Sequence, residues 1–266
     1  MSEEELAKLL VYAKERGINF WDTALQYKTH AHVREALKYI KRQEVVIVTK
    51  LVSSRSRETT EMFHQSLREL GIDYVDVCLV HGVRTERELR NRHGALAALL
   101  DCKKAGKIRA VGISSHGLSA LKAVIGMPEI DLVWARINFS GLCMDRSCLG
   151  LYDQLASFSL LKKTAKAILP QKIISGIRPT PETESVSEDD RREAEEILKV
   201  IHAQSKGVVG MKVFAEGHLG DKAGEALMYV NGLSFVDSFI VGMLNRKEID
   251  ENCRIIAGVE KLEDRE

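Results

Sequence analysis

Short apolar runs alternate with longer stretches of helical periodicity along most of the chain. Seven of these runs read as strands, at residues 18–22, 45–50, 75–81, 110–116, 132–138, 207–214 and 238–243. They are rich in Val and Ile and hold few polar positions, which indicates strands that are buried on both faces. The intervening stretches are long enough for helical crossovers between parallel strands. The pattern therefore predicts an α/β fold with a parallel sheet.

The chain begins with a predicted helix that precedes the first strand. Ser2 and Glu5 have the spacing of a capping box, and Gly17 marks the end of the helix. Leu6 and Leu10 lie on one helical face, which we expect to pack against the core.

A second irregular segment lies around residues 145–187, which hold three of the four prolines and are too long for a single crossover. We expect an insertion there, with an extra helix near 151–168 and an exposed loop near 170–187. A regular helix should follow from about Glu188. A disordered surface segment, a lid and a contact for a partner are the alternatives for the insertion.

Polar side chains stand at the ends of four successive predicted strands. They are Asp22, Lys50, His81 and the group Ser114, Ser115 and His116. Taken singly, each has an ordinary explanation, such as a loop cap or a histidine that satisfies a core hydrogen bond. In a closed (β/α) barrel, however, the carboxyl ends of the strands meet at one mouth, where barrel enzymes hold their catalytic groups. An acid, a base and an imidazole on the same edge favour such a barrel over a doubly wound sheet.

Composition narrows the choice of partners. The 266 residues show no break in composition and fit one barrel domain over 1–266. The net charge of +1 gives no basic surface for nucleic acid or an anionic membrane, so the expected partner is a small molecule or a protein. The five cysteines form no C-x-x-C pair, which argues against a structural metal. The N-terminus has no long apolar run, so we expect a cytoplasmic location.

Four segments of the sequence resemble signatures of the aldo/keto reductase family. They are GINFWDTALQY (17–27), SLRELGIDYVDVCLVHG (66–82), AGKIRAVGISSHG (105–117) and VGMLNRKEIDEN (241–252). The resemblance implies a TIM-type (β/α) barrel with seven recognisable strands of the usual eight, because the chain begins in the helix that follows the family's first strand. The alternatives are a truncated or alternatively spliced chain, or a barrel edge that is closed by part of the insertion or by a second subunit.

The same resemblance implies a catalytic tetrad of Asp22, Tyr27, Lys50 and His81. Its expected reaction is the reduction of an aldehyde or ketone, or oxidation of the alcohol, by NAD(P)H without a metal. Tyr27 would protonate the carbonyl oxygen as negative charge develops there. Lys50 would lower the pKa of Tyr27, Asp22 would hold Lys50, and His81 would orient the substrate. The alternative is a catalytically weak or inactive relative that binds a cofactor or regulates a partner.

The resemblance also implies a set of cofactor contacts. They are Ser114, Ser115, Trp134, Met211, Lys212, Gly242, Arg246, Glu251 and Asn252. The first four would hold the nicotinamide, and the others would meet the pyrophosphate and adenosine end. A cationic side chain beside the 2′-phosphate is the usual means of selecting NADP(H), so Arg246 favours NADP(H) over NAD(H).

Overall fold

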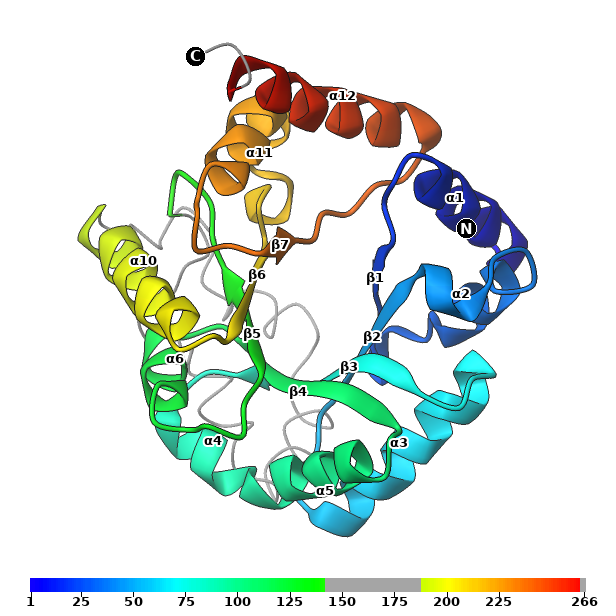
Figure 1. Ribbon diagram of the computed structural model, residues 1–266, viewed down its shortest axis with the longest axis vertical. Coiled ribbons are helices and arrows are strands. Elements are labelled where there is room, and N and C mark those ends of the chain that lie inside the picture. The colour runs from blue at the N-terminus through cyan, green and yellow to red at the C-terminus, as the bar shows by residue number, and fades with distance from the viewer. Residues whose placement is uncertain (142–187, 264–266) are drawn as a thin grey trace, which may run out of the picture.

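The computed structural model describes residues 1–141 and 188–263, and its strands form one curled parallel sheet (Figure 1). The strands are β1 (Phe20–Asp22), β2 (Val46–Leu51), β3 (Val75–Val83), β4 (Ile108–Ser115), β5 (Leu132–Arg136), β6 (Gly207–Met211) and β7 (Ser238–Phe239). Each strand pairs with the next one along the chain, in the order β1 to β7. A TIM-type barrel requires this order and direction, so the predicted fold class is confirmed.

Helices cover the outer side of the curled sheet (Figure 1). They are α1 (Glu3–Glu15), α2 (His30–Ala36), α3 (Ser56–Leu70), α4 (Glu86–Asn91), α5 (His93–Lys104), α6 (Leu118–Val124), α10 (Glu188–Ala203), α11 (Ala223–Asn231) and α12 (Arg246–Glu263). Short 3-10 turns occur at η1 (Leu25–Tyr27), η2 (Arg42–Glu44), η4 (Ala215–Gly217) and η5 (Gly220–Lys222). None of the helices in the described part of the chain is long and apolar enough to cross a membrane.

The first helix has the predicted boundaries. The Ser2 side chain accepts a hydrogen bond from the backbone N–H of Glu5 (3.2 Å), and the Glu5 carboxylate accepts one from the N–H of Ser2 (2.7 Å). Gly17 follows the helix with a φ of +90°, a left-handed conformation that glycine adopts at little cost. The helix α10 begins at Glu188, as expected, whereas the insertion predicted around 145–187 lies outside the described residues.

Side chains of each strand alternate between two apolar layers. Outward residues such as Ile47, Cys78 and Val133 pack against the helices. The inward layer consists of Val48, Val77, Leu79, Leu132, Trp134, Val209 and Met211. Because side chains alternate along a strand, the same parity turns the polar residues Lys50 and Ser114 into the barrel near its mouth.

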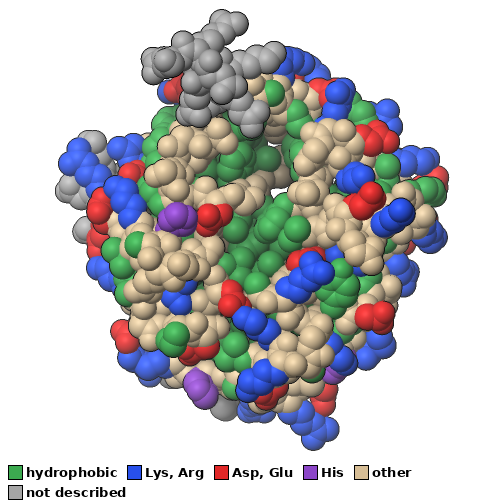
Figure 2. Space-filling view, viewed as in Figure 1, with side chains coloured by type: hydrophobic (Ala, Val, Ile, Leu, Met, Phe, Trp, Pro, Cys, Tyr) green, Lys and Arg blue, Asp and Glu red, His purple; other side chains and the backbone are tan. Residues whose placement is uncertain are grey.

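The sheet has two edges, at β1 and β7. Among the described residues, β1 pairs with β2 alone and β7 with β6 alone. Outside the sheet, the gap is spanned by the segment that leads from β7 to α12 and by the contact of α12 with α1 (Figure 1). Tyr12 of α1 donates a hydrogen bond to the Asp250 carboxylate of α12 (2.8 Å). The space-filling view, taken from the same side as Figure 1, shows that the centre of the barrel is hollowed and lined by hydrophobic side chains (Figure 2).

Candidate active site

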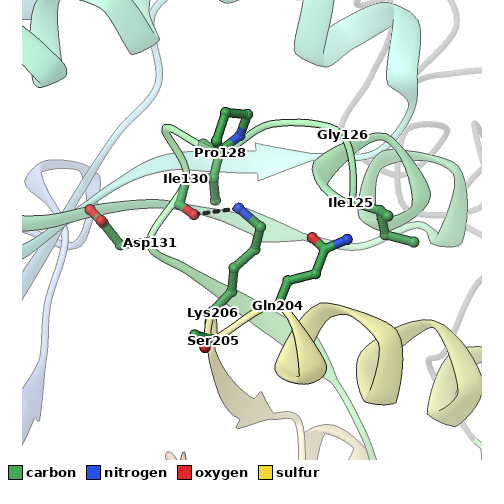
Figure 3. Close-up of a pocket in the computed structure, with 8 residues that line it drawn as sticks. All are labelled: Ile125, Gly126, Pro128, Ile130, Asp131, Gln204, Ser205 and Lys206. Atoms are coloured by element: carbon green, nitrogen blue, oxygen red, sulfur yellow. Dashed lines mark hydrogen bonds between the residues drawn. The ribbon is translucent and has the colours of Figure 1, made fainter.

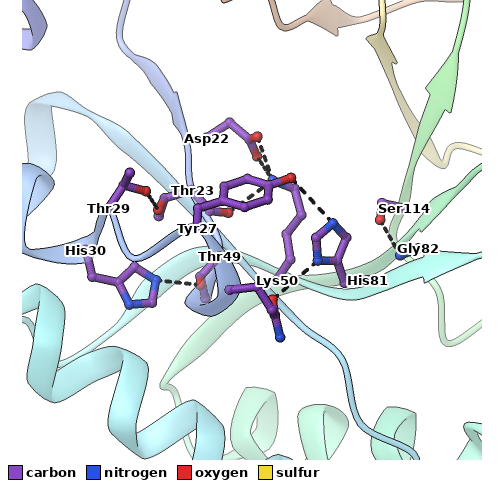
Figure 4. Close-up of polar contacts among 11 residues, drawn as sticks. Asp22, Thr23, Tyr27, Thr29, His30, Thr49, Lys50, His81, Gly82 and Ser114 are labelled. Atoms are coloured by element: carbon purple, nitrogen blue, oxygen red, sulfur yellow. Dashed lines mark hydrogen bonds and ion pairs between the residues drawn. The ribbon is translucent and has the colours of Figure 1, made fainter. Parts of the chain in front are cut away.

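The four predicted tetrad residues lie together at the C-terminal ends of β1, β2 and β3 (Figure 4). Asp22 ends β1, Tyr27 follows in the turn η1, Lys50 lies in β2 and His81 lies in β3. The Lys50 ammonium is 2.5 Å from both carboxylate oxygens of Asp22 and 4.8 Å from the centroid of the Tyr27 ring. The Tyr27 hydroxyl is 3.4 Å from His81 Nε2. The predicted grouping of these side chains is therefore present in the fold.

Lys50 and Asp22 form a buried ion pair. The Lys50 side chain is only 2% exposed, and its ammonium also donates a hydrogen bond to the backbone oxygen of Thr23 (3.0 Å). Burial lowers the pKa of Lys50 and raises that of Asp22, and in both cases the opposite charge of the partner works against the shift. Removing one member of such a pair costs about 3–5 kcal/mol, because it leaves the other charge buried alone.

Tyr27 is 49% exposed and lies with its ring beside the ammonium of Lys50. Burial, and secondarily the negative charge of Asp22, raises the pKa of Tyr27 to about 12. The net lowering of this pKa that was expected from Lys50 is therefore not found, because burial of the phenol outweighs the neighbouring ammonium. Near neutral pH the phenol is protonated, so it has a proton to donate.

His81 is neutral near pH 7. Burial, followed by the charges of Lys50 and Arg92, lowers its pKa to about 4. Its Nδ1 faces the amide oxygen of Gln26 at 3.4 Å. Because an amide oxygen only accepts hydrogen bonds, Nδ1 carries the proton and Nε2 accepts from the Tyr27 hydroxyl. Arg92 fixes the backbone here by donating a hydrogen bond to the His81 carbonyl oxygen (2.5 Å).

Two serines at the end of β4 take different orientations. Ser114 points into the barrel, and its hydroxyl accepts a hydrogen bond from the backbone N–H of Gly82 (2.8 Å). Ser115 lies on the outward face, where its hydroxyl donates to the Gly117 carbonyl oxygen (2.9 Å). Of this predicted pair, only Ser114 therefore faces the interior that holds the tetrad.

Trp134 and Met211 belong to the inward apolar layer. Trp134 is fully buried and stacks on the ring of Phe20, with centroids 5.6 Å apart. It is paired with Ser114 across the β4–β5 ladder, which places it close to the level of the tetrad. Lys212 follows Met211, and its ammonium lies 2.9 Å from the Glu216 carboxylate.

The remaining predicted cofactor residues lie where β7 leads into α12. Arg246 is 4.6 Å from the centroid of the Tyr12 ring on α1. Glu251 lies 3.7 Å from the ammonium of Lys247, and Gly242 and Asn252 belong to the same segment. The helix start itself is capped, because the Asn245 side chain accepts a hydrogen bond from the N–H of Glu248 (3.0 Å).

Comparison with known proteins agrees with this geometry. The sequence matches the Aldo/keto reductase family over residues 1–265. The chain belongs to this family. Methylglyoxal reductase DkgA of Escherichia coli (strain K12) is 28% identical over 180 residues, which is 65% of this chain and 64% of DkgA. The aldo-keto reductase yakc of Schizosaccharomyces pombe, whose name specifies NADP(+), is 26% identical over 166 residues, 56% of this chain and 48% of yakc. This chain thus spans less than two thirds of the length of these relatives.

Solved structures share the fold. The aldo-keto reductase AKR11C1 from Bacillus halodurans superposes with a TM-score of 0.67 at 19% identity, over 96% of this chain and 82% of that chain. The Bombyx mori aldo-keto reductase AKR2E4, solved in complex with NADP, gives a TM-score of 0.61 at 14% identity, over 98% of this chain and 83% of that one. At these identities the likeness establishes a common barrel fold and nothing finer.

The barrel interior fits the nicotinamide cofactor that the aldo/keto reductase family implies. The indole N–H of Trp134 is buried and has no hydrogen-bond acceptor among the described residues. Leaving a buried donor unpaired costs about 1–3 kcal/mol, so a ligand that brings an acceptor relieves a cost already present. The amide group of a nicotinamide is such an acceptor.

Two residues of the mouth were not predicted from the sequence, Arg136 and Gln26. Arg136 ends β5 two positions after Trp134, so strand parity turns it inward, and its charge helps to lower the pKa of His116 to about 3 after burial. Alternate residues of a strand face the same side, so the expected inward position of Trp134 also predicts an inward position for Arg136. Gln26 faces His81 only because η1 folds back over β3, and no sequence pattern signals that contact.

Proposed function

We propose that this chain reduces aldehydes or ketones with NAD(P)H, and that Tyr27 is the general acid. The observation that carries the proposal is the convergence of a buried Lys50–Asp22 pair, a protonated phenol and a neutral imidazole at the barrel mouth. A substrate carbonyl needs a proton donor beside its oxygen while hydride arrives at its carbon. The Tyr27 hydroxyl is the acidic group that is both partly exposed and within reach of His81.

The four side chains have separate tasks in this proposal. A bound reduced nicotinamide supplies the hydride. Tyr27 then gives its hydroxyl proton to the carbonyl oxygen, which becomes the alcohol, and the resulting phenolate is stabilised by the Lys50 ammonium beside its ring. Asp22 holds that ammonium in place. His81 Nε2 orients the Tyr27 hydroxyl before transfer, and the phenolate regains a proton from solvent because Tyr27 is half exposed.

We propose the cofactor contacts that the family resemblance implies, and the placement of the inward residues supports them. Ser114, Trp134 and Met211 would meet the nicotinamide, and the segment that carries Arg246 would meet the adenosine end. We favour NADP(H) over NAD(H), because the names of two similar proteins specify NADP, although an Escherichia coli relative, 27% identical over 165 residues, is an NADH-specific methylglyoxal reductase. These names also make methylglyoxal the first substrate to assay. We further propose that residues 1–266 form a single domain with an insertion around 145–187.

The test begins with fluorescence titrations of the protein by NADPH and by NADH, followed by reduction of methylglyoxal. Tyr27→Phe should lower turnover by roughly 10²–10⁴-fold and leave the cofactor Kd unchanged. The matched control is Tyr39→Phe, which removes the hydroxyl of a tyrosine that is 68% exposed. Turnover that survives Tyr27→Phe would refute the assigned acid. Saturable cofactor binding by the native chain without reduction of any carbonyl would instead indicate a non-catalytic cofactor-binding protein.

A further inference from the structure

A second polar network lies beside the tetrad, on the helix-facing side of β2, and centres on His30, the first residue of α2 (Figure 4). His30 is 1% exposed. Its Nδ1 donates a hydrogen bond to the carboxylate of Glu69 on α3 (2.8 Å), and its Nε2 lies 3.0 Å from the hydroxyl of Thr49 on β2. A carboxylate only accepts, so the proton is on Nδ1 and Nε2 accepts from Thr49. The imidazole therefore joins α2, α3 and β2.

Thr49 is the immediate neighbour of Lys50. Because residues alternate along a strand, Thr49 faces the helices while Lys50 faces the barrel interior. Thr49 is fully buried, so its hydroxyl has a fixed environment. A contact between His30 and Thr49 consequently sets where the start of α2 lies relative to the lysine of the tetrad.

The loop that carries Tyr27 runs between these two anchored points. At its first end, the Thr23 N–H donates to the Val48 oxygen (3.0 Å) and the Thr23 oxygen accepts from Lys50. Toward its second end, the hydroxyls of Thr23 and Thr29 share a hydrogen bond (2.7 Å), and His30 follows directly. Tyr27 itself is half exposed, and the only hydrogen bond recorded for its hydroxyl among the described residues is 3.4 Å long. Its position must therefore depend on how the loop is held.

We propose that His30 is a positioning residue for catalysis, which holds the loop 23–30 against β2 through Thr49 so that the Tyr27 hydroxyl stays beside Lys50 and His81. The inference rests on the proposed function for its catalytic consequence. Its structural part, that His30 restrains the loop, stands independently of any reaction. The contact to Glu69 orients the imidazole, and the contact to Thr49 transmits its position to the active site.

Two substitutions separate these contacts. In His30→Gln the side-chain amide reaches the place of Nε2, so the partner of Thr49 is kept and that of Glu69 is lost. In His30→Asn the shorter amide occupies the place of Nδ1, so the partner of Glu69 is kept and that of Thr49 is lost. Each variant loses one hydrogen bond of the imidazole, a buried one to Thr49 in His30→Asn and a partly buried one to Glu69 in His30→Gln. A purely structural role therefore predicts lower stability in both variants but no selective fall of kcat in His30→Asn.

We expect His30→Asn to lower kcat by roughly 10- to 100-fold with an unchanged cofactor Kd, because small displacements of a catalytic group cost this much. His30→Gln should keep kcat close to that of the native chain. Amide hydrogen exchange supplies the readout without turnover: in His30→Asn the amides of residues 23–29 should exchange about tenfold faster, whereas in His30→Gln they should not. His64→Asn, on the helix that carries Glu69, is the matched control.

Equal kcat and equal exchange rates in His30→Asn and His30→Gln would overturn the proposal. A larger effect in His30→Gln would overturn it too, since that result assigns the restraint to α3 rather than β2. If the native chain reduces no carbonyl compound, the proposed function fails, while the exchange rates still decide whether His30 holds the loop.

Discussion

Two lysines are buried at opposite ends of the barrel, and their partners differ. Lys50, near the mouth, is 2% exposed and is paired with the Asp22 carboxylate. Lys206, just before β6 at the other end, is 6% exposed and donates a hydrogen bond to the backbone oxygen of Ile130 (2.8 Å) (Figure 3). It donates a second one to the backbone oxygen of Met127 (2.6 Å). It lines a cavity of about 470 Å³ between the loop before β5 and the end of α10. Burial of a lysine therefore does not by itself mark an active site; its partners do.

The surroundings of the two ends differ in the same way. At the end opposite the mouth, Asp76 binds Arg42 (2.6 Å), Arg109 (2.9 Å) and the N–H of Ile47 (2.8 Å), so its carboxylate has partners on both oxygens. At the mouth, Tyr27 is half exposed and the Trp134 N–H has no acceptor among the described residues. The Asp76 carboxylate is satisfied within the protein and stabilises the fold, whereas the Trp134 N–H at the mouth remains for a ligand.

The largest expected effect is the loss of activity in Lys50→Met. This change removes the charge that stabilises the Tyr27 phenolate and frees Asp22, so kcat should fall by roughly 10²–10⁴-fold. The measurement is carbonyl reduction by protein whose circular dichroism is that of the native chain. The matched variant Lys206→Met should keep kcat within about threefold, because Lys206 lies at the opposite end of the barrel from the tetrad. A threefold change corresponds to less than about 1 kcal/mol in the activation free energy. Unchanged activity in Lys50→Met would contradict the role given to the tetrad.

The features that the sequence predicted best are those that depend on local pattern. Apolar runs gave the seven strands, and the spacing of Ser2 and Glu5 gave the cap of α1. Residues at successive strand ends share one edge whenever the sheet is parallel, so the grouping of Lys50 and His81 also followed. These predictions needed periodicity and order along the chain rather than distances.

The features that escaped prediction depend on distances between segments remote in sequence. The pKa of Tyr27 is set by its burial and by Asp22, and its direction follows only when these are placed in space. Arg246 lies over the Tyr12 ring because α12 packs on α1. No residue pattern within either helix predicts that packing. His30 and Lys206 looked like ordinary polar residues in the sequence, and only the fold shows what they bind.

A smaller effect is expected on the stability of Lys206→Met. The change leaves the carbonyl oxygens of Met127 and Ile130 without their donor, so the free energy of unfolding should fall by about 1–3 kcal/mol. Urea denaturation measures this difference. Lys199→Met, at a lysine whose side chain is 48% exposed on α10, is the control and should change stability little. If Lys206→Met were as stable as the native chain but inactive, Lys206 would serve activity rather than stability. The proposed division between a catalytic end and a structural end of the barrel would then be wrong.

The smallest effect concerns pH. The folded protein holds the pKa of His81 at about 4, whereas an unfolded chain has the ordinary value of about 6.5. Between these values the unfolded state binds more protons, so the free energy of unfolding contributed by neutral His81 is fully present above pH 6.5 and is lost as the pH falls toward 4. Burial also lowers the pKa of His116 and of His30, which adds to the same trend.

The variant His81→Gln isolates this contribution, because glutamine does not titrate. Urea midpoints measured from pH 7 to pH 4 should fall less steeply for His81→Gln than for the native chain. His93→Gln, at an exposed histidine that begins α5, should follow the native curve. Parallel curves for His81→Gln and the native chain would mean that His81 is protonated equally in both states. The mouth would then not be the acid-sensitive end of the barrel, and the contrast between the two ends would rest on Lys50 and Lys206 alone.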